Sequence, residues 1–327
     1  MDKKLLEKKI VEARIPEERI DPGLRPFAAK FPAMPFSREM IGEAGGTPPM
    51  VMEPAVSTET VTVTEKHVPG PKGAPDVHVR VFSPVKRKGL IGGLLWIHGG
   101  GYVYELMEMD DSRCMRFALE SNCVVVSVDY RVAPKHPYPA PLEDCYAVLE
   151  WFSENAEELG VDKKRIAVAG GSAGGGLTAA VCLLARDRKG PEITFQILLS
   201  PMIDDRHITP SSTEFTDLRF WNFQGNIICW DAYLGDIPDD EVPIYAAPSR
   251  AKDLSGLPPA YILVGELEIF RDESIDYTAR LARAGVTTEF HIFPGCFHGF
   301  EVLADGEISR MANDEVVRVI KTALEKK

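Results

Sequence analysis

The stretch that decides the fold is Gly170-Gly171-Ser172-Ala173-Gly174, in which glycines flank a serine. The preceding residues 165–169 are short and mostly apolar, as in a buried strand. After the stretch, Leu177, Val181 and Leu184 are spaced as on one face of a helix. A tight turn between a strand and a helix exposes the serine hydroxyl and aims the helix N-terminus at it. The pattern therefore predicts a nucleophile elbow, with Ser172 as the nucleophile.

A different interpretation of the same glycines is a dinucleotide-binding loop. Residues 174–179 match the loose pattern G-x-G-x-x-A, which requires an acidic residue about 20 positions later, at the end of the next strand. The corresponding residues 191–198 contain one acid, Glu192, and it precedes the expected strand. The nucleophile elbow is the better interpretation.

Composition and charge exclude several classes of partner. The chain has 327 residues, enough for one large α/β domain or two smaller ones, and its 45% hydrophobic and 26% charged residues are typical of a globular enzyme. The net charge of −12 argues against nucleic acid and anionic membrane surfaces, because both would repel the protein. The charge says nothing finer about the substrate.

The cysteines and the N-terminus predict a cytoplasmic protein without a membrane span. The first nine residues carry charges where an export signal needs an apolar run, and no stretch approaches the roughly 18 apolar residues of a membrane helix. The six cysteines are scattered without a C-x-x-C pair. They resemble small buried hydrophobic residues, so neither a disulfide framework nor a zinc site is expected.

Strand and helix patterns alternate from about residue 60 onward. This alternation predicts a mostly parallel sheet with helices on both faces, and two alternating segments predict an antiparallel pair at one edge. Helices are expected around residues 142–152, 177–186, 277–284 and 317–324. The predicted strands are residues 60–67, 76–82, 90–97, 124–128, 166–169, 194–199, 261–264 and 287–293.

Two regions fall outside this alternation. Residues 1–55 begin with a short amphipathic helix pattern and continue as a proline-rich segment with many apolar residues, which predicts packing against another part of the protein. An insertion at residues 204–248 contains the aromatic cluster Phe215, Phe220, Trp221, Phe223, Trp230 and Tyr233. It is expected to have a small core of its own and, with residues 1–55, to form a cap over the site. The catalytic domain would then comprise residues 56–203 and 249–327.

A serine nucleophile needs a base, and the candidate bases are histidines. In elbow enzymes the chain order is serine, acid, histidine, which leaves His207, His291 and His298. His207 begins the insertion, and His291 lies within a predicted strand. His298 follows that strand in a glycine-bounded loop, where catalytic groups of an open α/β sheet collect. His298 is therefore the predicted base.

The orienting acid is expected after the strand at residues 261–264. Glu268 lies in the following loop and is the preferred acid. Asp272 is the reserve, because its position also suits the first turn of a helix. Amides for the oxyanion are expected from Ala173, directly after the nucleophile, and from the glycine loop at residues 99–101. His98 is expected to position that loop through hydrogen bonds.

Several motifs in a fixed order resemble one family. From about residue 60 to the C-terminus the chain resembles the hormone-sensitive lipase family of α/β-hydrolases, the bacterial family IV carboxylesterases. Besides the elbow, the similar motifs are His98 to Gly101, residues 129–134, 136–140, 142–144 and 200–204, and His298-Gly299-Phe300.

The resemblance implies a fold, a site and an activity. The fold would be an α/β-hydrolase fold with an eight-stranded, mostly parallel sheet and a helical cap formed by the N-terminus and the central insertion. Gly100, Gly101 and Ala173 would supply the oxyanion amides. The expected substrates are esters with short-to-medium acyl chains, without a cofactor or metal, and a homodimer is consistent with the family.

The chain departs from the family pattern at two positions. The family usually has aspartate where this chain has Glu268, and either carboxylate can orient an imidazole. The family elbow commonly reads Gly-Asp-Ser-Ala-Gly, whereas this chain has Gly171 before the serine, which removes a side chain next to the nucleophile.

The sequence as a whole predicts a serine carboxylesterase that works through an acyl-enzyme. A non-catalytic small-molecule receptor on the same fold is the alternative from another class. A deacetylase or an amidase with the same three residues is a further alternative, because fold alone does not decide the bond that is cleaved.

Overall fold

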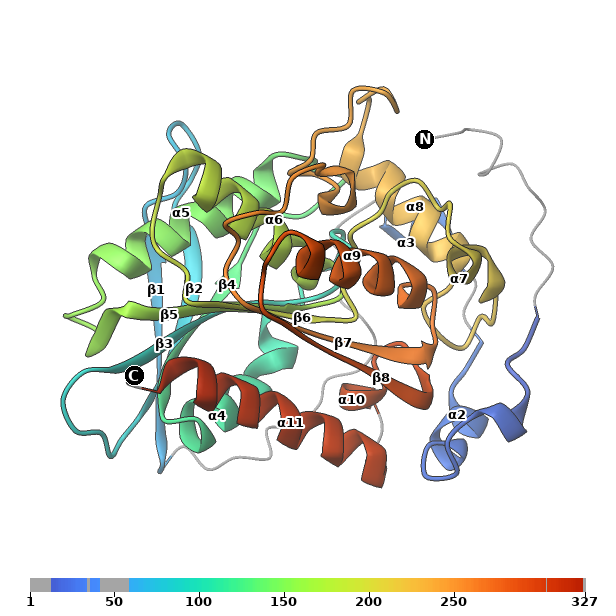
Figure 1. The fold of residues 1–327 in the computed structure, drawn as a ribbon, viewed down its shortest axis with the longest axis horizontal. Coiled ribbons are helices and arrows are strands. Elements are labelled where there is room, and N and C mark those ends of the chain that lie inside the picture. The colour runs from blue at the N-terminus through green and yellow to red at the C-terminus, as the bar shows by residue number, and fades with distance from the viewer. Residues whose placement is uncertain (1–12, 34–35, 42–58, 304, 326–327) are drawn as a thin grey trace.

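The computed structural model describes residues 13–33, 36–41, 59–303 and 305–325 of the chain. At its centre is one eight-stranded sheet in the order β1-β2-β4-β3-β5-β6-β7-β8 (Figure 1). The strands are β1 (Val61–Val68), β2 (Val77–Pro84), β3 (Ile91–Ile97), β4 (Cys123–Asp129), β5 (Val161–Gly171), β6 (Phe195–Leu199), β7 (Ala260–Leu267) and β8 (Thr288–Phe297).

Strand pairing confirms the predicted mostly parallel sheet. The pairs β1–β2 and β2–β4 are antiparallel, and the remaining neighbours, from β4 across to β8, pair in parallel. In the register of the central strands, Gly170 of β5 lies opposite Ile97 of β3, and Gly171 lies opposite Leu199 of β6. The carboxyl ends of these strands therefore meet at one edge of the sheet, where the predicted site residues follow them.

Helices cover both faces of the sheet. In Figure 1, α5, α6 and α9 lie on one side of the strands, and α4 and α11 lie on the other. The α-helices are α2 (Arg25–Lys30), α3 (Arg38–Ile41), α4 (Asp111–Glu120), α5 (Ala140–Glu154), α6 (Ala173–Arg188), α7 (Pro210–Glu214), α8 (Phe223–Leu234), α9 (Arg271–Arg283), α10 (Phe300–Leu303) and α11 (Glu307–Leu324), and the 3₁₀ turns are η1 (Glu17–Arg19), η2 (Met107–Asp110) and η3 (Pro248–Arg250).

Two glycines in β3 explain how closely the helices pack on the sheet. A Cβ atom at Gly93 would lie 2.6 Å from Phe152 of α5, and one at Gly92 would lie 2.6 Å from Leu324 of α11. Every residue of β3 is buried. The bare backbone of this strand thus admits a large side chain on each face, which fixes both helical layers.

The insertion between β6 and β7 contains α7, α8 and η3, and the described part of the N-terminal segment packs against it. The Ile15 N–H donates to Asp217 at 2.8 Å, and Arg219 donates to the Ala28 carbonyl at 3.1 Å. In Figure 1, α2, α7 and α8 lie near the end of the molecule toward which β7 and β8 point. Both segments are therefore placed over the edge of the sheet that carries the site.

Some predictions lie outside the described residues, and some elements were not predicted. The amphipathic pattern at Leu6 and Ile10 falls in residues 1–12, which the structure does not describe. The helix α4, which precedes β4, had no counterpart among the predicted elements. In the described part of the chain, no helix has the length and apolar character that crossing a bilayer requires.

Candidate active site

Ser172 occupies the sharp turn between β5 and α6. Its φ of +56° and ψ of −119° lie in a region that residues with a side chain rarely adopt. The turn is held by hydrogen bonds: the Ser172 N–H donates to Leu199 of β6 at 2.8 Å, and its carbonyl accepts from Gly176 at 3.0 Å. The backbone therefore keeps the hydroxyl on the outside of the corner.

Neighbouring glycines are required by close backbone contacts at this turn. A Cβ at Gly170 would lie 2.3 Å from the Gly174 carbonyl oxygen, and one at Gly174 would lie 2.0 Å from the Ile97 carbonyl oxygen. Gly171 is different, because among the described residues other than its two chain neighbours only Arg113 Nη1 comes within 4 Å of its hypothetical Cβ, at 3.8 Å. The turn thus needs glycine at positions 170 and 174, but not at position 171.

His298 comes directly after β8 and Glu268 directly after β7, and both side chains belong to the same site as Ser172. His298 Nε2 lies 3.1 Å from Ser172 Oγ, and its Nδ1 lies 2.5 Å from Glu268 Oε2. A carboxylate only accepts, so Nδ1 carries the proton and Nε2 is free to accept from the serine hydroxyl. Three predicted residues far apart in the sequence therefore form one hydrogen-bonded chain.

Glu268 is fully buried, and its second oxygen is also satisfied. Oε1 accepts from the Gly265 N–H at 2.6 Å and from Ser200 Oγ at 2.7 Å. These donors fix the carboxylate so that Oε2 faces the imidazole. The role of Ser200 was not predicted; the only signal was its place in the family-like segment after β6, which says nothing about a contact 68 residues away.

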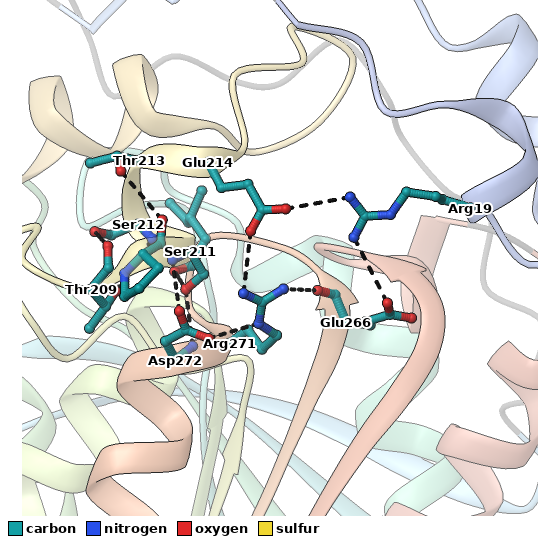
Figure 2. Close-up of polar contacts among 11 residues, drawn as sticks. Arg19, Thr209, Ser211, Ser212, Thr213, Glu214, Glu266, Arg271 and Asp272 are labelled. Carbon is teal, nitrogen blue, oxygen red and sulfur yellow. Dashed lines mark hydrogen bonds and ion pairs between the residues drawn. The ribbon is translucent and has the colours of Figure 1, made fainter.

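Asp272, the reserve acid, lies elsewhere. Figure 2 shows its carboxylate among residues of the insertion and α9: it accepts from the Ser211 N–H at 2.8 Å and pairs with Arg271 at 2.8 Å. Burial raises the pKa of Asp272, but the hydrogen bonds from Arg271 and Ser211 outweigh this and lower it. Of the two candidate acids, the structure brings only Glu268 to His298.

The two rejected histidines are engaged in other contacts. His207 is buried, its Nδ1 accepts from Asn226 at 3.2 Å, and burial lowers its pKa to about 4. His291 lies on β8 beside Glu289, at 3.2 Å. Neither histidine contacts Ser172, in agreement with the choice of His298.

The glycine loop after β3 lies directly against the nucleophile. A Cβ at Gly99 would lie 3.4 Å from Ser172 Cβ. Gly100 and Gly101 have φ values of +108° and +60°, and a Cβ at Gly101 would lie 2.6 Å from the Trp221 ring. Ala173 begins α6, so its N–H belongs to the helical amides without an intrahelical acceptor. These are the backbone positions predicted to face the oxyanion.

His98 positions this loop through hydrogen bonds, as predicted. Its Nδ1–H donates to the Gly99 carbonyl at 2.7 Å, and its ring stacks on Tyr130 with centroids 4.2 Å apart. The Tyr130 hydroxyl donates to the His98 carbonyl at 3.0 Å. Burial lowers the pKa of His98, which favours a neutral ring inside the protein.

Comparison with known proteins identifies the family of this chain. The α/β-hydrolase fold family matches residues 94–302. The chain belongs to this family.

Individual relatives of this α/β-hydrolase are esterases. It is 41% identical to esterase LipI of Mycobacterium tuberculosis over 207 residues, 63% of this chain and 65% of LipI. It is 37% identical to carboxylesterase NlhH of the same organism over 288 residues, 86% of this chain and 88% of NlhH. These relatives confirm the family that the sequence motifs predicted.

Solved structures extend the likeness to nearly the whole chain. A bacterial heroin esterase superposes with a TM-score of 0.87 at 39% identity, covering 94% of this chain and 99% of the other. Esterase LipW from Mycobacterium marinum gives a TM-score of 0.80 at 35% identity, covering 94% and 96%. The predicted fold class is confirmed.

The hydrolase has a cavity of about 420 Å³ in front of the nucleophile. Ser172 and His298 line it, together with aromatic side chains from the N-terminal segment and the insertion: Phe31, Phe36, Phe220 and Trp221. The Trp221 ring lies 6.2 Å from the His298 ring. Such walls exclude water around the imidazole and offer an apolar surface to an ester.

Among the described residues, one cluster of side chains has the donor atoms and spacing that could hold a metal ion. Atoms of Glu289, His291 and Glu315 lie within 4.8 Å of one another. All three side chains are partly exposed, and none of them lines the cavity that contains Ser172. Nothing connects this cluster with the serine chemistry.

Proposed function

We propose that this carboxylic ester hydrolase is a serine carboxylesterase that acts through an acyl-enzyme intermediate. The observation that supports this most strongly is the unbroken contact series from Ser172 through His298 to the buried Glu268, at the wall of a cavity. A receptor that only binds a ligand has no need for a serine placed at 3.1 Å from a base.

The first half of the reaction acylates the serine. His298 Nε2 takes the hydroxyl proton as Ser172 Oγ attacks the ester carbonyl, and Glu268 stabilises the imidazolium that forms. The amides of Gly100, Gly101 and Ala173 donate to the oxyanion. The C–O bond of the ester then breaks, and His298 gives its proton to the leaving alcohol.

The second half releases the acid. Water loses a proton to His298 Nε2 as its oxygen attacks the acyl carbonyl. The ester bond to Ser172 Oγ then breaks, and the proton on His298 returns to the serine. The product is a carboxylic acid, and the enzyme regains its starting protonation state without a cofactor.

The size and walls of the cavity support esters with short-to-medium acyl chains. About 420 Å³ accommodates a small ester, and the walls are largely aromatic. We assign residues 1–55 and 204–248 to a cap over the catalytic domain, formed by residues 56–203 and 249–327. The contacts of Ile15 and Ala28 with the insertion support joining these two segments into one cap.

Removal of the nucleophile tests this function. Ser172→Ala should reduce kcat/KM for p-nitrophenyl butyrate by roughly 10⁴-fold or more, as is typical for a lost triad nucleophile. The matched control is Ser83→Ala, on β2 and outside the lining of this cavity, which should retain full activity. Circular dichroism should show both variants folded. Undiminished turnover by Ser172→Ala would refute the assignment.

A further inference from the structure

A charged pair that the proposed mechanism does not use lines the cavity of Ser172. Arg113 comes from α4, and Glu301 comes from α10, three residues after His298. Their side chains are 9% and 6% exposed. Arg113 Nη2 lies 3.6 Å from Glu301 Oε1, close enough for an ion pair but too far for a hydrogen bond.

The pair leaves hydrogen-bonding capacity unused. Among the residues that the structure describes, neither Arg113 Nη2 nor Glu301 Oε2 has a hydrogen-bond partner. Arg219, which lines the same cavity, instead donates to Asp217 at 2.7 Å. Arg113 Nη2 and Glu301 Oε2 are themselves buried, although the side chains that carry them line the cavity. Burial of charged groups with unsatisfied atoms is costly, so stability does not explain this arrangement.

The guanidinium is held beside the nucleophile. Its carbon lies 5.3 Å from the centre of the Trp96 ring, which limits its freedom to swing away. On the other side, Arg113 Nη1 lies 3.8 Å from a hypothetical Cβ at Gly171. An aspartate at position 171 would place a carboxylate within reach of the guanidinium. Gly171 has no side chain and therefore gives the guanidinium no such partner.

We propose that Arg113 and Glu301 form a subsite for a hydroxyl group of the ester substrate. This inference rests on the proposed function. The hydroxyl oxygen accepts from Arg113 Nη2, and its hydrogen is donated to Glu301 Oε2, so that one neutral group satisfies both unpaired atoms. A hydroxyl is the smallest group that donates and accepts at once.

Charged substrate groups fit this subsite less well. A carboxylate near Arg113 would be repelled by Glu301 and by Asp110, which also lines the cavity. An ammonium group near Glu301 would be repelled by Arg113. Asp110 is itself engaged, because it accepts from Trp96 Nε1 at 2.8 Å. The substrate class is therefore an ester whose acyl or alcohol part carries a free hydroxyl.

Matched ester pairs test the proposal on the full-length protein. Ethyl 3-hydroxybutyrate is compared with ethyl butyrate for a hydroxyl in the acyl part, and 4-hydroxybutyl acetate with butyl acetate for one in the alcohol part. In a pH-stat assay, kcat/KM should be about tenfold or more higher for the hydroxylated ester in at least one pair. This is the range expected for a hydrogen bond to a charged group.

Three variants show whether the pair causes this preference. Arg113→Leu and Glu301→Gln should each lower the preference ratio toward one. Gly171→Asp should do the same. There is room for a side chain at position 171, and the new carboxylate would pair with the Arg113 guanidinium in place of the substrate hydroxyl. Arg116→Leu is the control: this arginine lies on the same helix but pairs with Glu120 and Asp314, outside the cavity, and the ratio should stay unchanged.

The outcomes separate this inference from the proposed function. Ser172-dependent hydrolysis with equal kcat/KM inside both ester pairs would refute the hydroxyl subsite and leave the esterase intact. The same conclusion follows if the wild type prefers monoethyl succinate to ethyl butyrate, or if Arg113→Leu keeps the full preference. Loss of the proposed function would look different, because Ser172→Ala would then hydrolyse every ester as fast as the wild type.

Discussion

Glu268 and Asp272, two acids four residues apart after β7, differ in burial and in their hydrogen-bond partners. Glu268 is fully buried, and both of its oxygens are bound, one to His298 and the other to Ser200 and Gly265. Asp272 has a partly exposed side chain in the first turn of α9 and binds Ser211 of the insertion (Figure 2). Glu268 binds the imidazole of His298, whereas Asp272 attaches the insertion to α9.

The difference teaches that the role of an acid is decided by the donors that surround it. Aspartate is the residue the family commonly uses, and Asp272 is available nearby, yet the position that faces His298 holds glutamate. The longer side chain of Glu268 reaches the imidazole while its other oxygen stays anchored at 2.6 Å and 2.7 Å to donors behind it. Residue type alone would have favoured the wrong acid.

The largest expected effect comes from Glu268→Gln. A glutamine amide can donate to His298 Nδ1 and so place the ring proton on Nε2, where it blocks acceptance from Ser172. We expect kcat for p-nitrophenyl butyrate to fall roughly 10³–10⁴-fold with KM little changed. A variant that retained most of the wild-type kcat would show that Glu268 does not orient the base.

The matched substitution Asp272→Asn should affect stability more than catalysis. The asparagine oxygen still accepts from Ser211, so mainly the ion pair with Arg271 is lost, which costs about 1 kcal/mol. Thermal unfolding should begin about 2 °C lower, and kcat should stay close to the wild-type value. If this variant lost more activity than Glu268→Gln, the two roles would have to be exchanged.

The smallest expected effect concerns Glu273, a third acid in the same segment. It is buried, it accepts from the Ile203 N–H at 2.9 Å, and burial raises its pKa well above the usual value. The folded protein therefore holds a proton that the unfolded chain releases above about pH 4.3, so the contribution of Glu273 to stability falls as pH rises toward its folded pKa.

Glu273→Gln removes this titration and retains a carbonyl oxygen that can accept from Ile203. Between pH 6 and pH 9, the variant should lose less unfolding free energy in guanidinium titrations than the wild type. Its esterase activity should match the wild type. Equal pH dependence of the two proteins would mean that Glu273 is already ionised in the folded state.

Much of the fold followed from local patterns. The buried strand before Ser172, the apolar strand before His98 and the hairpin at one edge were predictable, because each is a short segment with its own periodicity and turn residues. The helix α4 was not predicted. Its buried residues Cys114, Met115, Phe117 and Ala118 are spaced as on one helical face, so the sequence did carry a signal for this short helix, and it was overlooked.

The candidate site was predictable where chain order constrains chemistry and not where it depends on distant contacts. Chain order reduced seven histidines to three, the loop after the last strand then selected His298, and the loop after β7 offered Glu268. No local pattern indicates that Ser200 binds Glu268 or that Arg113 faces Glu301, because these contacts join separate strands and helices. The oxyanion amides, the cap boundaries, the cytoplasmic location and a homodimer stay predictions.

The most direct test is to locate the covalent adduct that a reactive phosphonate ester forms with the full-length enzyme. Such a reagent phosphonylates a serine whose hydroxyl is activated by a neighbouring base. Peptide mass spectrometry after complete inhibition should place a single adduct on Ser172, and Glu268→Gln should slow its formation. Complete inhibition with the adduct on another residue, or an unmodified Ser172 in the inhibited enzyme, would contradict the account.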